Sequence, residues 1–75
     1  MSDHYFYQWL MTQRKPEGAN EVEQFANNAF FDQSFPKHTH DYQIISNYLE
    51  ENGGYLPTLA IFDEAYRQFQ EIEHK

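Results

Sequence analysis

Aromatic side chains are the main apolar material of this chain, and this property constrains its fold more than any other. Seven Phe, six Tyr and one Trp make up 19% of the 75 residues. Each large ring buries roughly 150–250 Å² on folding, so a few rings can fill a small core. The chain is near the lower size limit for independent folding, and it has no cysteine for a disulfide or thiolate–zinc link. We therefore expect residues 1–75 to form one domain with an aromatic core.

The spacing of the apolar residues predicts helices, whereas no run of alternating β-branched residues predicts a strand. The first helix is expected over about residues 3–13, with Ser2 or Asp3 as its N-cap. The second is expected to begin after Asn20, with Glu23 completing a capping box. Their predicted core faces consist of Phe6, Trp9 and Leu10 on the first helix, and of Val22, Phe25, Ala26, Ala29 and Phe30 on the second.

The polar segment 32–40 predicts an ordered loop, because Pro36 interrupts it. We expect Phe35 to insert its ring into the core and to hold this loop in place. A third helix is expected to follow, capped by Thr39 or His40.

The third helix is expected to end near Asn52, at a pair of glycines of which one is expected in the left-handed conformation. A fourth helix is expected to begin near Pro57 or Thr58. The predicted core faces consist of Tyr42, Ile45, Tyr48 and Leu49 on the third helix, and of Leu59, Phe62, Tyr66, Phe69 and Ile72 on the fourth.

Short sequence blocks along the chain resemble those of a known family. Among them are Ser34-Phe35-Pro36-Lys37, Asp41-Tyr42, Tyr55-Leu56 and Phe62-Asp63-Glu64-Ala65, in this order. They resemble the YozE-like family of short, uncharacterised bacterial proteins, over nearly the whole chain. The resemblance implies a fold like the sterile alpha motif, an all-α, compact bundle of four to five short helices. It implies no activity, because a fold of this kind does not select a function. His38 and His40 depart from the family pattern, which argues against a family-wide role for them.

The acidic balance of the chain disfavours several classes of partner. The net charge is −7, and such a field repels nucleic acids and anionic membranes. No apolar run approaches the roughly 20 residues of a transmembrane helix, and the first residues lack the pattern of a signal peptide. The absence of cysteine is compatible with a reducing compartment. We therefore expect a cytoplasmic protein that does not associate with membranes.

Metal and catalytic signatures are weak in this sequence. The sequence His38-x-His40-Asp41 offers metal-ligating groups, but a site would need a further ligand from His4, His74 or a glutamate. The carboxylates fall on polar helix faces, where solvation is expected instead of acid–base chemistry. For Asp63, we expect a capping role or an ion pair with Lys37 or Arg14. The sequence therefore predicts no metal, no cofactor and no catalytic residue.

The aromatic residues outside the predicted core faces indicate a candidate interaction surface. They either complete the edge of the core with their hydroxyls in water or dock a partner or a second copy. The candidate surface consists of Tyr5, Tyr7, Phe31, Tyr55, Lys37, His38 and His40.

Three functional classes follow from these features. The leading hypothesis is a non-catalytic protein-interaction module, whose acidic frame would favour basic partners. The alternative is a nucleic-acid-binding module, for which Arg14, Lys15 and Lys37 should converge on one face, or an acidic competitor of a nucleic-acid-binding protein. An enzyme ranks lowest, because a bundle this small has little room for a cleft.

Overall fold

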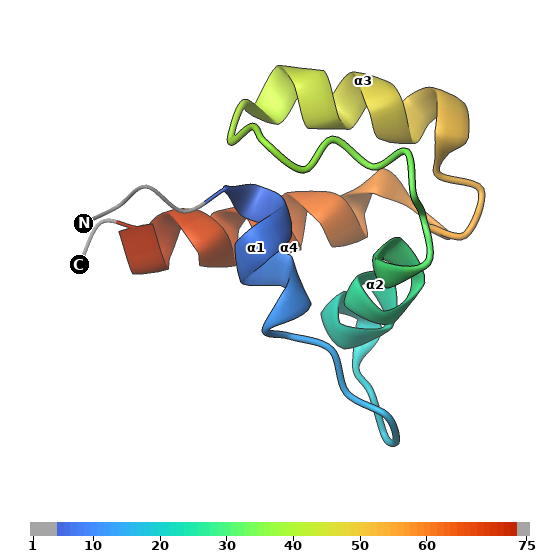
Figure 1. The fold of residues 1–75 in the computed structure, drawn as a ribbon. Helices are drawn as coiled ribbons and strands as arrows, with labels where there is room; N and C mark the ends of the chain where they lie inside the picture. Colours follow the sequence, from blue (N-terminus) through green and yellow to red (C-terminus); the bar gives the residue numbers. More distant parts are fainter. Residues whose placement is uncertain (1–4, 74–75) are drawn as a thin grey trace.

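The computed structural model describes residues 5–73, and these residues form four helices without a strand. In chain order the helices are α1 (Phe6–Met11), α2 (Glu21–Phe30), α3 (Tyr42–Asn52) and α4 (Leu59–Glu73). α4 is the longest and packs against each of the other three (Figure 1). The segment between α2 and α3 runs along the side of α3 that faces the rest of the bundle (Figure 1). The predicted all-α bundle is therefore confirmed.

Phenylalanine rings form the centre of the core, as the composition predicted. The Phe6 ring is fully buried, and its centroid lies 5.5 Å from that of Phe62 and 5.6 Å from that of Phe69. Both of these contacts are edge-to-face, a geometry that aromatic quadrupoles favour. Phe35 is buried too, with its ring 6.5 Å from Phe6. The prediction that Phe35 holds its loop in the core is confirmed.

Capping explains where the middle helices begin. The backbone N–H of Glu23 donates to Asn20 Oδ1, and Glu23 Oε1 accepts from the N–H of Asn20, so the predicted capping box is confirmed. At α3 the predicted caps, Thr39 and His40, are wrong. Asp41 caps this helix, because its Oδ1 accepts from the backbone N–H groups of residues 43 and 44.

The first helix is shorter than predicted. It begins at Phe6 instead of Asp3, and the expected caps at Ser2 and Asp3 lie outside the described residues. It ends at Met11, and Thr12 and Gln13 continue as turns closed by bonds to the carbonyls three residues earlier.

The glycine pair that ends α3 does not adopt the expected left-handed conformation. Gly53 is the C-cap with φ −95°, and the positive φ among the described glycines belongs to Gly18 at 65°. Gly53 is required for a different reason: a Cβ there would lie 2.6 Å from the carbonyl oxygen of Leu49. Close backbone approach, not a positive φ, explains glycine at this position.

Three residues predicted to lie on core faces are exposed: Phe30, Tyr42 and Ile72. The Tyr42 ring still stacks on the buried Phe62, at 5.2 Å between centroids. Conversely, Ile61 is buried although the periodicity did not place it on the core face. No helix among residues 5–73 is long and apolar enough to cross a membrane.

Candidate interaction surface

The end of α2 carries the most exposed aromatic ring of the described chain. Phe31 follows the last helical residue and is 79% exposed, and its neighbour Phe30 is 46% exposed. The two rings lie edge-to-face at 5.1 Å. On the helix, Phe30 is one turn beyond the buried Ala26, so the periodicity placed it in the core. Instead, the two rings form an apolar projection beside the turn that follows α1.

A cation covers the Phe30 ring. The guanidinium carbon of Arg14 lies 4.1 Å from the ring centroid, and Arg14 Nε donates to the carbonyl of Met11. The next residue is fixed to α2, because Lys15 N–H donates to Asn27 Oδ1 (3.0 Å) while Asn27 Nδ2 donates to the Lys15 carbonyl (2.8 Å). Asn27 therefore anchors the segment that carries both basic residues beside the exposed rings.

A second pair of cation and ring involves Tyr7, in the first turn of α1, and Lys37. Lys37 Nζ lies 5.1 Å from the Tyr7 ring centroid and donates to the carbonyl of Gln33. The Tyr7 ring packs on Phe35 at 5.4 Å, so the buried Phe35 supports it from below. Tyr7 and Met11 are spaced at i and i+4, which places them on the same side of α1. Arg14 lies in the turn beyond the helix, where its backbone N–H and its Nε both donate to the Met11 carbonyl.

The start of α1 adds a third aromatic group. Phe6 N–H donates to the Thr39 carbonyl at 3.3 Å, which joins the start of α1 to the segment before α3. The Tyr5 ring consequently lies edge-to-face with His38 at 5.7 Å and stacked with His40 at 6.5 Å between centroids. Tyr66 fixes this segment further, because its hydroxyl donates to the His40 carbonyl at 2.6 Å.

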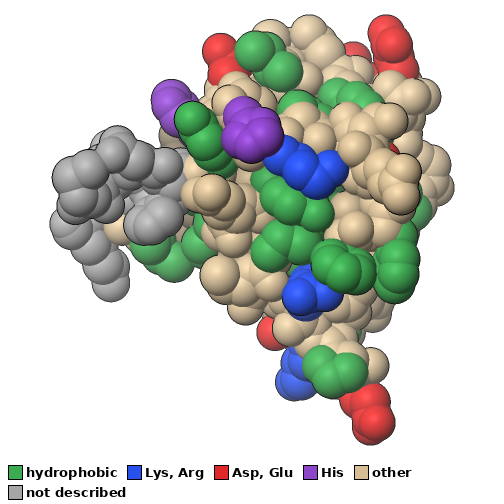
Figure 2. Space-filling model, in the orientation of Figure 1, with side chains coloured by type: hydrophobic (Ala, Val, Ile, Leu, Met, Phe, Trp, Pro, Cys, Tyr) green, Lys and Arg blue, Asp and Glu red, His purple; other side chains and the backbone are tan. Residues whose placement is uncertain are grey.

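We refer to these side chains together as the aromatic–cationic face. Figure 2 views the molecule from this side: Lys and Arg side chains lie between hydrophobic ones, histidines lie above them, and acidic side chains are at the margins. The face consists of Tyr5, Tyr7, Arg14, Lys15, Phe30, Phe31, Lys37, His38 and His40.

Most residues of the predicted interaction surface lie on this face, but Tyr55 has a different role. Its hydroxyl donates to Asp32 Oδ2 at 2.8 Å, and Tyr48 donates to both oxygens of the same carboxylate at 2.7 Å. Burial, with the hydrogen bond to Asp32 second, raises the pKa of Tyr48 to about 12 and also raises the pKa of Tyr55. We call this cluster the Asp32 staple. The Tyr55 ring also borders an open hollow of about 380 Å³ beside Phe31.

The sequence reasoning missed two features of the site and mispaired a third residue. It placed Phe30 in the core, and it did not connect Asp32 with the two tyrosines. Asp63 does not pair with Lys37 or Arg14; its Oδ1 accepts from the Tyr42 hydroxyl at 2.5 Å. For Phe30, the available signal was its place as the last residue of the helix, followed directly by a second phenylalanine.

The candidate metal-ligating groups, from which no metal site was predicted, make other contacts in the structure. The Asp41 carboxylate caps α3, and the rings of His38 and His40 lie against Tyr5. Within residues 5–73, no three His, Cys, Asp or Glu side chains gather in a way that could hold a metal ion. His4 and His74, the further ligands considered from the sequence, lie outside the described residues.

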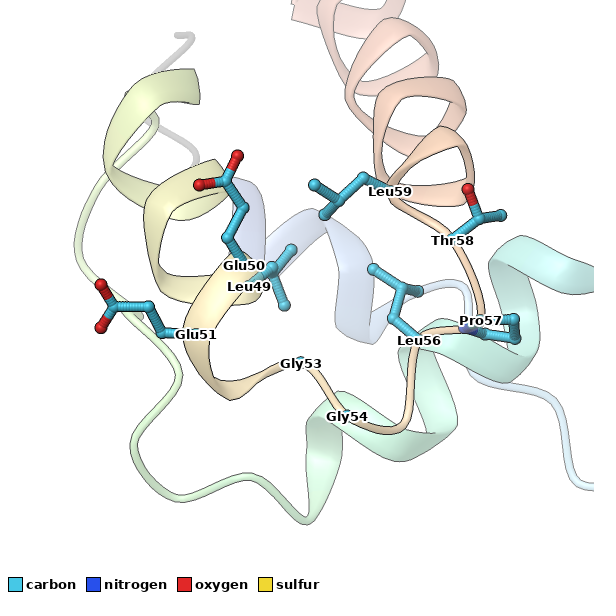
Figure 3. A pocket seen from close by; sticks show the side chains of 9 residues that line it. All are labelled: Leu49, Glu50, Glu51, Gly53, Gly54, Leu56, Pro57, Thr58 and Leu59. Carbon is cyan, nitrogen blue, oxygen red and sulfur yellow. The ribbon is translucent and has the colours of Figure 1, made fainter.

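A groove of about 390 Å³ lies between the end of α3 and the start of α4. Figure 3 shows Leu49, Leu56 and Leu59 directed toward it, while Glu51 points away from it. The only ionisable groups in its lining are the carboxylates of Glu50 and Glu51. This groove thus supplies apolar contact and negative charge, and the Thr58 hydroxyl in its lining accepts a hydrogen bond from the Ala60 N–H.

The described chain is therefore a small helical bundle with an aromatic core and an exposed aromatic–cationic face. Comparison with known proteins assigns its family: the family model described as the YozE SAM-like fold matches residues 5–71, and the chain belongs to this family. The resemblance inferred from the sequence blocks is thereby confirmed.

Relatives from lactic acid bacteria match most of the chain, and each bears the name UPF0346 protein. The one from Latilactobacillus sakei is 65% identical over 68 residues, which cover 91% of this chain and 92% of the relative. The one from Limosilactobacillus reuteri is 64% identical over 64 residues, 85% and 88% of the two chains. The one from Oenococcus oeni is 55% identical over 75 residues, 100% and 99% of the two chains. The shared name states no activity.

Proposed function

We propose that this protein is a non-catalytic protein-interaction module of the bacterial cytoplasm and that its contact surface is the aromatic–cationic face. The observation that carries the proposal is the Phe30–Phe31 pair with Arg14 stacked on it. Aromatic residues and Arg are the types enriched in the centres of protein interfaces and among their energetic hot spots. Because the Phe31 side chain is 79% exposed, it contributes little hydrophobic stabilisation to the fold, and a partner that covered it would gain this stabilisation.

The ionisable groups support a non-catalytic role. A general acid or base works best with a pKa near the working pH. Among the described residues with shifted pKa values, the shifts lead away from neutrality: burial raises the pKa values of Tyr48 and Tyr55, and a hydrogen bond from Arg67 lowers the pKa of Glu64. These shifts suit structural hydrogen bonds and an ion pair better than proton transfer.

Capture from a bacterial lysate tests this function. The immobilised protein is incubated with a lysate of Latilactobacillus sakei, and the bound proteins are identified by mass spectrometry. We expect at least one protein to bind the wild type and to be lost with Phe31→Ala. Ile44→Ala is the matched control, because Ile44 is 52% exposed but lies on α3, outside the face. If no captured protein distinguishes the two variants, the assigned surface is wrong.

Nucleic-acid binding is the second candidate, and one specific observation favours it. Arg14 and Lys37 each lie over an aromatic ring near the exposed Phe31, as in proteins that combine backbone contacts with base stacking. A labelled single-stranded RNA at low salt tests it by fluorescence anisotropy. Binding that weakens steeply with added salt would support this candidate, and its absence would dismiss it.

A further inference from the structure

The charge of the aromatic–cationic face is opposite to that of the whole chain. The net charge is −7, yet the Arg14 and Lys37 side chains lie over rings of this face, and the backbone of Lys15 is bonded to Asn27 beside it. Three of the four described Lys and Arg residues therefore belong to the face or border it. The fourth, Arg67, is engaged on α4. The face thus forms a basic island in an acidic protein.

The island is not neutralised by its own neighbours. Arg67 pairs with the carboxylates of Glu64 and Glu71, whereas no described carboxylate pairs with the three cations of the face. Asp32, the acidic residue next to Phe31, keeps its charge, but its oxygens accept from the hydroxyls of the Asp32 staple and form no ion pair with a described cation. The cations therefore keep donor capacity for an external acceptor.

The cations are also held in place before any partner binds. Arg14 uses Nε for the Met11 carbonyl and lies over the Phe30 ring, which leaves its terminal NH₂ groups for a ligand. Lys37 uses one donor for the Gln33 carbonyl and lies over Tyr7. A cation restrained by a ring loses less rotational freedom on binding. Such preorganisation is what a carboxylate-binding surface requires.

Resting on the function proposed above, we propose that the face binds an acidic protein segment whose carboxylates meet Arg14 and Lys37 and whose apolar side chain packs on Phe31. In the polyproline II conformation three residues complete one turn, so side chains at every third position lie on the same side of an extended segment. A segment with Glu at every third position therefore presents its carboxylates to one surface. This partner chemistry reverses the basic partner expected from the net charge.

The ring faces favour a protein segment over a single-stranded nucleic acid. Base stacking needs open ring faces, but Arg14 covers a face of Phe30, and Lys37 lies over a face of Tyr7, so of these three rings Phe31 is the open one. A nucleic acid also carries a charge at every nucleotide and would extend beyond three cations toward Glu17 and Asp41. A short acidic segment can remain within the island, since charges beyond about 8 Å are largely screened at physiological salt.

The probe is a short labelled synthetic peptide in which Glu recurs at every third position with Leu between, measured by fluorescence anisotropy on the full chain. We expect saturable binding, which weakens about tenfold when Gln replaces each Glu. Arg14→Glu and Lys37→Glu should each weaken it about tenfold, while the control Arg67→Glu, off the face, leaves it unchanged. Arg14→Gln and Lys37→Gln, which remove charge without reversing it, keep the test valid if a reversal unfolds the chain.

Several outcomes would overturn the inference: no binding of the Glu peptide, equal binding of the Gln peptide, indifference to the Arg14 and Lys37 variants, or tighter binding of single-stranded RNA than of the peptide. The lysate experiment separates this failure from that of the proposed function. If captured proteins still depend on Phe31 while the peptide test fails, the face is an interface for a partner of other chemistry.

Discussion

The Asp32 staple offers the sharpest test of how this small bundle is held together. Tyr48 on α3 and Tyr55 in the loop before α4 donate to one carboxylate in the loop after α2. One side chain thus connects three segments that are distant in the sequence. We expect Tyr55→Phe to remove one of these connections while preserving the ring that packs on the core.

The expected cost follows from the chemistry of the bond. A hydrogen bond to a charged group contributes about 1.5 to 3 kcal/mol, and the lower value applies because Tyr48 continues to solvate the carboxylate. A chain of this length has a total stability of about 4 to 11 kcal/mol. A loss of about 1.5 kcal/mol lowers the melting temperature of such a domain by about 6 to 12 °C. Removing both hydroxyls leaves the Asp32 carboxylate with the Ser34 N–H as its hydrogen-bond donor. We therefore expect the double variant to be less stable by about 1 kcal/mol more than the sum of the two single changes.

Urea unfolding and thermal melts followed by circular dichroism measure these values. The matched control is Tyr42→Phe, because the Tyr42 hydroxyl also donates to a carboxylate, that of Asp63, but in an exposed position. Its expected effect is below about 0.5 kcal/mol. If Tyr55→Phe and Tyr42→Phe cost the same, or if the double variant is additive, the carboxylate does not act as a staple.

The remaining predictions concern single positions. Gly53→Ala should lower the free energy of unfolding by about 1 to 2 kcal/mol in urea, because the new Cβ would meet the Leu49 carbonyl; Gly54→Ala, with open space around it, should be neutral or slightly stabilising. Asp41→Ala should lower the free energy of unfolding by about 1 kcal/mol through loss of the N-cap of α3. An unchanged urea midpoint would contradict the capping role. The pKa of Tyr48 is raised to about 12 in the folded chain against about 10 in the unfolded chain. The contribution of the protonated Tyr48 to the free energy of unfolding is therefore complete below pH 10. It is lost between about pH 10 and 12 at up to about 1.4 kcal/mol per pH unit, and unfolding curves at rising pH should show this slope.

The sequence predicted the elements that depend on local chemistry. The capping box of α2 needs only Asn20 and Glu23, which are three residues apart, and the structure contains it. The burial of Phe35 followed from a ring in a polar, proline-bound loop. The cap of α3 was misassigned because the helix was expected to begin one or two residues too early. Asp is a stronger N-cap than Thr, and Asp41 is the residue that caps the observed first turn.

The surface could be predicted only in part, since it depends on contacts between distant segments. Tyr7 and Lys37 were both recognised as candidates, but their pairing results from the loop that Phe35 anchors beside α1. The Asp32 staple joins residues 16 and 23 positions apart. No periodicity encodes such pairs, because the chain path between them is irregular.

The exposure of Phe30 connects the core with the surface. Ala26 and Ala29 on α2 and Ala65 on α4 are fully buried, and these small side chains allow the two helices to approach closely. A phenyl ring in that contact would hold the helices apart, so the ring one turn beyond Ala26 is better accommodated at the rim. There it is covered by Arg14, which the Asn27–Lys15 bonds fix beside α2. The same close packing that stabilises a bundle of this size therefore places an aromatic ring and a cation together on its outside, where a partner can reach both.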